Sequence, residues 1–70
     1  MSNKIKIILN EQEYRITNST TLNDLLIYLN YNLALIVLEY NKKILVKSNW
    51  KNTLLQSNDQ IEIITIVGGG

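Results

Sequence analysis

Apolar and polar positions alternate along two segments near the start of the chain, residues 4–10 and 13–17. In the first segment one side is entirely apolar: Ile5, Ile7 and Leu9. In the second, Tyr14 and Ile16 face alike. A period of two residues is typical of a β-strand, because successive side chains point to opposite faces of a sheet. The polar residues 10–12 between the two segments predict a tight hairpin that pairs the strands.

The period changes after a polar loop at residues 18–20. Four leucines then recur at the spacing of one helix face: Leu22, Leu25, Leu26 and Leu29. Such a stripe predicts an amphipathic helix. Thr21 is the expected N-cap, with Asp24 three residues later as an acid that resembles a capping box. Asn30 or Asn32 is expected to end the helix, because asparagine tolerates the left-handed backbone conformation.

A third strand and its partner are predicted in the middle of the chain. Residues 35–40 are apolar and rich in branched side chains, which is typical of a buried strand. A polar turn at residues 41–43 lets residues 44–46 pair back on that strand. Ser48 follows as the expected cap of a single helical turn.

The last strand is predicted over residues 60–67, after a turn at residues 57–59, and it is apolar on both faces. One face carries Ile61, Ile63 and Thr65, and the other carries Glu62, Ile64 and Ile66. Because central strands are covered on both sides, we place this strand beside the first one, parallel to it, in the middle of a mixed sheet of four or five strands. The order of elements predicts an α+β protein of the β-grasp (ubiquitin-like) plan, with one main helix packed on one face of the sheet.

Composition restricts the chemistry of this single 70-residue domain. The chain has no Cys and no His, which we take to exclude a disulfide framework, a zinc site, a thiol nucleophile and an imidazole base. Its net charge of +1 gives no strong field for nucleic acid or acidic lipid. Because no run of about 20 apolar residues occurs, no membrane span is expected either. We therefore expect neither nucleic acid nor a membrane as partner, and no metal or bound cofactor.

Two groups of side chains invite a functional interpretation, and each also has a simpler structural one. Glu11 and Glu13 stand close together at the predicted hairpin, where they form either a pair of catalytic acids or a solvated edge. Trp50 is either a stacking platform for a ligand or a half-buried anchor of the core. The structural interpretation is favoured in both cases.

The end of the sequence offers a different kind of chemistry, because all three glycines are its last three residues: Gly68, Gly69 and Gly70. Glycine is costly to order and adds no packing, so we expect a domain over residues 1–67 and a flexible tail over residues 68–70. Extended, such a tail reaches about 10 Å. Adenylation would activate its terminal carboxylate, and sulfur could then replace oxygen to give a thiocarboxylate. Simple fraying or a cloning scar is the alternative explanation.

These features resemble the ThiS family of ubiquitin-like sulfur carriers. The likeness covers nearly the whole chain and is carried by residues 5–10, 21–26 and 38–44, by Trp50, and above all by residues 59–70 with their terminal glycines. Asn58 stands where the family commonly has glycine, and asparagine can adopt the positive φ that the turn needs. The related molybdopterin carriers also end in two glycines, but they are usually longer and often have a proline before the tail, which this chain lacks.

The resemblance implies a carrier that is a protein cosubstrate and not an enzyme. A ubiquitin-activating-like adenylyltransferase would use Mg-ATP to adenylate Gly70, and a sulfur donor fed by a cysteine desulfurase would form the thiocarboxylate. Thiazole synthase would then receive the sulfur for thiamin, in a bacterial cytoplasm or in a plastid stroma. Three alternatives stay open: a carrier subunit of molybdopterin-synthase type, a ubiquitin-like modifier of lysines, and an interaction domain with an inert tail.

Such a carrier needs a docking surface, and the alternation of the strands predicts one. The sheet face away from the helix is expected to present five apolar residues: Ile8, Leu35, Val37, Ile64 and Ile66. An exposed apolar patch usually marks an interaction site. The alternative is that the Trp50 segment and loops cover this face, and a slip of one residue in the register would exchange the two faces.

Overall fold

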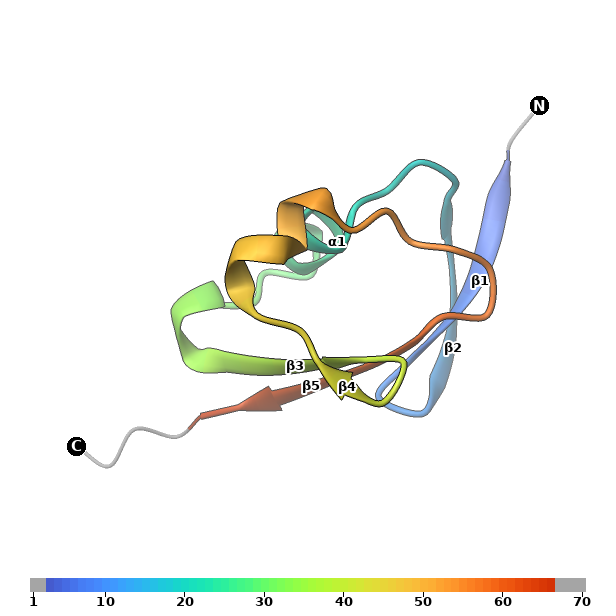
Figure 1. Ribbon diagram of the computed structural model, residues 1–70. Helices are drawn as coiled ribbons and strands as arrows, with labels where there is room; N and C mark the ends of the chain where they lie inside the picture. Colours follow the sequence, from blue (N-terminus) through green and yellow to red (C-terminus); the bar gives the residue numbers. More distant parts are fainter. Residues whose placement is uncertain (1–2, 67–70) are drawn as a thin grey trace.

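The computed structural model describes residues 3–66 (Figure 1). Within this range the strands are β1 (Lys4–Leu9), β2 (Gln12–Thr17), β3 (Ile36–Tyr40), β4 (Lys43–Ile44) and β5 (Gln60–Thr65). The helical elements of the same range are α1 (Leu22–Tyr28) and two 3₁₀ turns, η1 (Leu33–Leu35) and η2 (Lys47–Asn52).

The five strands of the described chain form one mixed sheet in the order β2-β1-β5-β3-β4. β1 and β5, the first and last strands, lie side by side and run parallel, whereas the other neighbours are antiparallel. Figure 1 shows α1 and η2 on the same side of this sheet. The arrangement confirms the predicted α+β, β-grasp fold, with the main helix on one face.

Asparagine supplies several of the tight turns in a domain body whose described part contains no glycine. Both hairpins turn through two residues with positive φ, Asn10-Glu11 and Asn41-Lys42. This type of turn matches the twist of the flanking strands. Asn30 (φ 64°) follows the end of α1, and Asn58 (φ 71°) forms the turn before β5, as the sequence predicts for both. Asparagine suits these positions because its short polar side chain tolerates the left-handed region.

The start of α1 is also as predicted, since the Thr21 hydroxyl accepts a hydrogen bond from the Asp24 amide (3.1 Å). Asn32 has a different role from the one expected as an alternative helix stop. Its side chain caps η1 by accepting from the Ala34 amide (3.1 Å). Leu35 therefore belongs to this 3₁₀ turn, and the strand predicted from residue 35 begins one residue later, at Ile36.

Other boundaries also differ from the sequence prediction, since β1 ends at Leu9 and not at residue 10, and β2 begins at Gln12 and not at residue 13. β4 covers Lys43–Ile44 and not residues 44–46, although the Leu45 amide still donates to the Leu38 carbonyl (3.0 Å). Ser48 lies inside η2 and does not cap it, because the Val46 carbonyl already accepts from the Asn49 amide (3.0 Å) and begins the turn earlier. β5 ends at Thr65. The predicted boundary between residues 1–67 and the tail lies outside the described residues.

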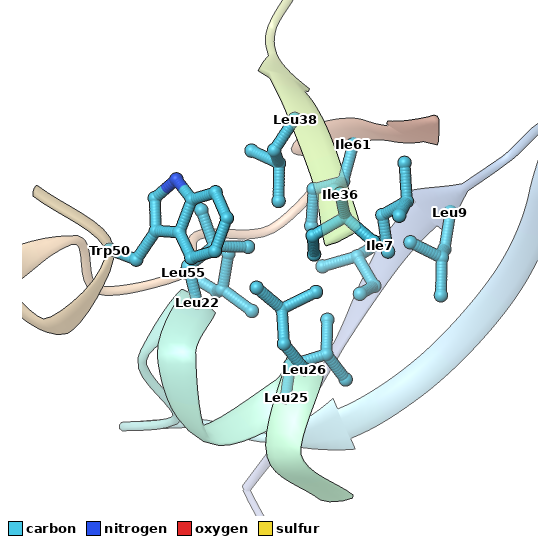
Figure 2. Close-up of a cluster of buried hydrophobic side chains, with 11 residues drawn as sticks. Ile7, Leu9, Leu22, Leu25, Leu26, Ile36, Leu38, Trp50, Leu55 and Ile61 are labelled. Atoms are coloured by element: carbon cyan, nitrogen blue, oxygen red, sulfur yellow. The ribbon is translucent and has the colours of Figure 1, made fainter. Parts of the chain in front are cut away.

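The core fills the space between α1 and the inner face of the sheet (Figure 2). Its fully or nearly buried side chains come from every layer: Ile7, Leu9, Leu22, Leu25, Leu26, Ile36, Leu38, Trp50, Leu55, Ile61 and Ile63. Trp50 is buried among them, and its indole N–H donates to the Leu45 carbonyl (2.9 Å). The interpretation of Trp50 as a core anchor is confirmed, since an indole ring is well buried when its N–H finds a partner.

Removal of a core side chain from α1 should destabilise the protein strongly. Leu26 is 0% exposed, whereas the next residue, Ile27, is 56% exposed. We expect Leu26→Ala to lower the free energy of unfolding by about 2–5 kcal/mol. Ile27→Ala, the matched control, should change it by no more than about 0.5 kcal/mol. Urea unfolding followed by Trp50 fluorescence measures both, and equal effects would contradict this assignment of the helix faces.

Candidate functional site

The described chain ends just after β5, the central strand of the sheet. Ile66, its last residue, donates its amide hydrogen to the Leu35 carbonyl (2.6 Å), so the pairing with β3 extends one residue beyond the strand. Figure 1 shows this end of β5 at the margin of the sheet, next to η1. The predicted reactive tail, Gly68, Gly69 and Gly70, lies outside the described residues, and the site can be built as far as Ile66.

Four apolar side chains gather around this end of the sheet: Leu35, Val37, Ile64 and Ile66. Val37 and Ile64 are direct cross-strand partners, and Leu35 lies beside Ile66. Ile64 is 49% exposed, Ile66 47% and Leu35 43%, while Val37 is half-buried. We call these four residues the chain-end patch.

The helical elements do not cover the chain-end patch in the described part of the chain. The buried neighbours of its strand residues, Ile36, Leu38 and Ile63, belong to the core on the opposite face, where α1 and η2 pack. Trp50 also belongs to that core. Burial of the outer face under the Trp50 segment is therefore excluded, and the assignment of faces from the alternating pattern holds.

Ile8 does not lie with the other four residues, and its predicted place in one continuous patch is wrong. The parallel register sets Ile8 beside Gln60, four residues before Ile64 on β5. Four strand residues correspond to about 13 Å. Ile8 is half-buried and lines a shallow hollow of about 250 Å³ with Glu11, Glu39, Lys42, Gln60, Ile61 and Glu62. The alternating pattern assigns a residue to one face of the sheet, but it does not give the register, that is, which residue of the parallel neighbouring strand lies beside it.

Two of the residues that line this hollow are carboxylates on the side nearest to the chain-end patch. Glu39 on β3 and Glu62 on β5 are direct cross-strand partners. Like charges in that position repel and weaken the pairing. The sequence places Glu62 on the outer face, but only the register of β3 against β5 identifies Glu39 as its partner.

Asp59 organises the start of β5. Its buried carboxylate accepts hydrogen bonds from the Tyr40 hydroxyl, from Asn41 Nδ2 (3.1 Å) and from the Gln56 amide (2.8 Å). Asn41 Oδ1 in turn accepts from the Gln60 amide (2.8 Å). These bonds join the β3–β4 hairpin to the turn before β5. They fix where β5 enters the sheet and therefore which of its residues reach the chain-end patch.

Asn10 marks the point where β1 stops following β5. Its amide donates to the Ile61 carbonyl (2.9 Å), and its side-chain Oδ1 accepts from the Ile63 amide (2.8 Å). The chain turns into the β1–β2 hairpin at Asn10, so β1 offers β5 no further main-chain acceptor. The side-chain oxygen of Asn10 takes the place of that acceptor. The sequence predicts Asn10 to be a turn residue, and no pattern in it indicates this contact across 53 positions.

The other side-chain sites considered from the sequence have structural explanations. Glu11 and Glu13 are both exposed, and Glu13 lies 3.8 Å from the Arg15 guanidinium at the solvated hairpin. Among residues 3–66, no three acidic side chains are grouped so that they could bind a metal ion. In the same range, no helix has the length and apolar character needed to cross a membrane.

The chain is similar to known proteins both in sequence and in structure. The sequence model of the ThiS family matches residues 5–70. A protein of Trieres chinensis described as uncharacterized protein ycf40 is 53% identical over 62 residues, which span 89% of this chain and 85% of that protein. The crystal structure of a thiamine biosynthesis protein (ThiS) from Geobacter metallireducens matches with a TM-score of 0.81, over 94% of this chain and 100% of that one. At 20% identity, this last match shows a common fold.

The contact between Tyr40 and Asp59 should give the protein a distinctive alkaline transition. Burial, and then the hydrogen bond to Asp59 and its negative charge, raise the pKa of Tyr40 from 10.0 to about 12. The neutral phenol is the form that the fold favours. Its stabilising effect is therefore complete below pH 10 and is lost as the pH rises through about 12.

Ultraviolet absorbance of the phenolate during a pH titration tests this. We expect one of the four tyrosines to ionise last, and the late step to vanish in Tyr40→Phe. The control Tyr28→Phe, at a well exposed residue, should retain it. Urea unfolding should show the loss of stability between pH 10 and 12 in the wild type, and a smaller loss in Tyr40→Phe. Ionisation of all four tyrosines in one step would contradict the effect of Asp59.

Proposed function

The chain belongs to the ThiS family of small ubiquitin-like sulfur carriers, and from this membership we propose that it delivers sulfur as a thiocarboxylate formed at Gly70. The observation that carries the proposal is the extent of the family match, which runs through residue 70 and so includes all three glycines. The glycines are then part of what the family shares and not an appendage to the domain.

The proposed chemistry takes place at the α-carboxylate, which is ionised at neutral pH because its pKa is about 3.3–3.7. A carboxylate oxygen attacks the α-phosphorus of ATP, and pyrophosphate leaves. The terminal sulfur of a persulfide then attacks the carbonyl carbon of the acyl adenylate, and AMP leaves with the oxygen. A thiol next attacks the S–S bond of the resulting acyl persulfide, which releases the thiocarboxylate and leaves a disulfide. The carrier contributes only the reacting carbonyl. A chain without His or Cys suffices for this role, because the catalytic groups belong to the partner enzymes.

The partners follow from this chemistry. A ubiquitin-activating-like adenylyltransferase uses Mg-ATP and catalyses the first step. A cysteine desulfurase system supplies the sulfur, and thiazole synthase accepts it for thiamin. The match to the ThiS family supports the thiazole route over the molybdopterin route, and the protein of similar fold from Geobacter metallireducens is a thiamine biosynthesis protein. In this scheme the protein is a cosubstrate that is consumed and regenerated, and not an enzyme.

We assign docking of these enzymes to the chain-end patch, Leu35, Val37, Ile64 and Ile66. Its exposed apolar side chains have no cover in the described chain, and such patches usually mark interaction sites. Gly70 stands four residues beyond Ile66, which corresponds to about 13 Å of extended chain. An enzyme that binds the patch therefore holds the domain within reach of its own active site. Ile8, at the other end of the sheet face, has no part in this contact.

The plastid stroma is the proposed compartment. The relative from Trieres chinensis carries a ycf name, which belongs to plastid-encoded proteins, and the two chains are alike over most of their length. The excess of Ile, Asn and Lys in the sequence agrees with translation from an AT-rich genome.

The mass of the intact protein tests the proposed chemistry. After incubation with Mg-ATP, the adenylyltransferase and a sulfur source, we expect a mass increase equal to the exchange of one oxygen for one sulfur. Deletion of Gly68, Gly69 and Gly70 together should abolish the exchange without unfolding the domain, since the packed core ends well before them. A series of heavier species, each carrying the protein joined to a lysine, would indicate a protein modifier instead. An exchange that continues without the three glycines would exclude the tail as the site.

Substitution within the patch tests docking separately from chemistry. We expect Ile64→Glu to raise the KM of adenylation by roughly tenfold with little change in kcat, because the contact holds the carrier and not the reacting atoms. Ile27→Glu is the control, since Ile27 is a similarly exposed isoleucine on α1, on the other face of the sheet. It should leave KM within about twofold of the wild type. Equal effects of the two variants would place the docking surface elsewhere.

A further inference from the structure

β5 is longer than the part of it that β1 covers. β1 and β5 pair only through Ile8 with Gln60 and Leu9 with Ile61. On its other side, β5 stays paired with β3 as far as Thr65. Figure 1 shows β5 continuing past the β1–β2 hairpin toward the chain end. The last part of this central strand is therefore open along one side in the described structure.

The hydrogen bonds show which main-chain groups face the open side. The Ile61 carbonyl and the Ile63 amide bond to Asn10, on the β1 side. The Gln60 carbonyl and the Ile66 amide bond to Asn41 and Leu35, on the β3 side. Because these directions alternate along a strand, the Ile63 carbonyl and both main-chain groups of Thr65 point to the side that β1 has left. They have no protein partner within the described residues.

The hairpin sequence determines where this open edge begins. Asn10-Glu11 turns the chain with only two residues, so β1 stops at Leu9. Asn10 Oδ1 then occupies the Ile63 amide. The free edge is thus confined to the Ile63 carbonyl and Thr65, and Thr65 is exposed. An unpaired edge is a template for another strand, and a short one limits uncontrolled pairing between copies.

We propose that an extended segment of the adenylating enzyme pairs with this open edge, adding a strand beside β5 at Thr65. The proposal rests on the proposed function, because Thr65 lies five residues from Gly70 and an enzyme that takes up that residue must hold the chain here. The edge offers alternating main-chain donors and acceptors, which an extended main chain satisfies best. It is also continuous with the chain-end patch, since Ile64 and Ile66 flank Thr65.

The two contacts have different tasks. The patch supplies apolar area, and that kind of contact has little directional preference. Main-chain hydrogen bonds at Thr65 fix the register, that is, which residue stands at which position along the enzyme strand. A slip by one residue would move the terminal carboxylate by about 3.3 Å along the chain, which is enough to misplace it for attack on ATP.

Proline at position 65 tests the pairing with little risk to the fold. Thr65→Pro removes the amide donor on the open side and leaves the β3 side intact, and proline is tolerated at strand positions whose N–H faces solvent. We expect kcat/KM for adenylation, measured with the ubiquitin-activating-like adenylyltransferase and Mg-ATP, to fall by roughly tenfold.

Thr17→Pro is the matched control. Thr17 ends β2 at the opposite margin of the sheet, and its amide points away from β1, because the residues on either side, Ile16 and Asn18, face that strand. It should keep kcat/KM within about twofold of the wild type. Urea unfolding of both variants verifies that each is folded. Equal activity of Thr65→Pro and Thr17→Pro would overturn the proposal.

Amide hydrogen exchange provides a readout that does not depend on substitution. In the complex with the enzyme, exchange at Thr65 should slow by roughly tenfold or more, while Ile64, already paired with β3, should change little. Unchanged exchange at Thr65 would overturn the proposal. So would slowing that depends on the concentration of the free carrier alone, which would mean pairing between two copies. If the enzyme fails to adenylate the wild type at all, the proposed function itself fails, whereas adenylation without protection of Thr65 removes only this inference.

Discussion

The placement of β5 between β1 and β3 is the interaction on which the rest of the structure depends. It makes a strand from the end of the chain the centre of the sheet, so that Ile61 and Ile63 can pack against α1 while Ile64 stays outside. The buried carboxylate of Asp59 fixes where the strand enters, and Asn10 fixes where its pairing with β1 stops. Because the body holds β5 so firmly, the residues that follow it begin from a defined point.

Much of this arrangement could be predicted from the sequence, because the relevant signals are local and periodic. Alternation assigned the inner and outer faces of β1 and β5 correctly, and the leucine stripe with Thr21 located α1. The grouping of Ile8 with Ile64 failed for a physical reason. A period of two assigns a residue to a face, whereas its neighbour across a parallel pair depends on how far one strand slides along the other.

The hydrogen bonds that Asp59 and Asn10 form with β5 and its neighbours could not be predicted from the sequence either. Asp59 looked like an ordinary turn residue, and its bonds to Tyr40 and Asn41 connect positions that only the folded sheet brings together. The helical turn predicted after Ser48 begins earlier, at Lys47, because the Val46 carbonyl accepts its first hydrogen bond, and η1 was not predicted. The glycine tail lies at the other extreme. Its interpretation comes from residue type and position, and no folded contact is needed to state it.

The outer face of the sheet is divided in a way that the fold alone does not require. Glu39 and Glu62 face each other across β3 and β5, an arrangement that costs free energy because like charges oppose directly. Beyond them toward the end of β5, the outer-face residues of β3 and β5 are apolar. Glu39 and Glu62 thus bound the chain-end patch on the side away from Ile66. The chain-end patch lies where the central strand is also open along one edge, so a partner that uses both contacts is held beside the residues that lead to Gly70.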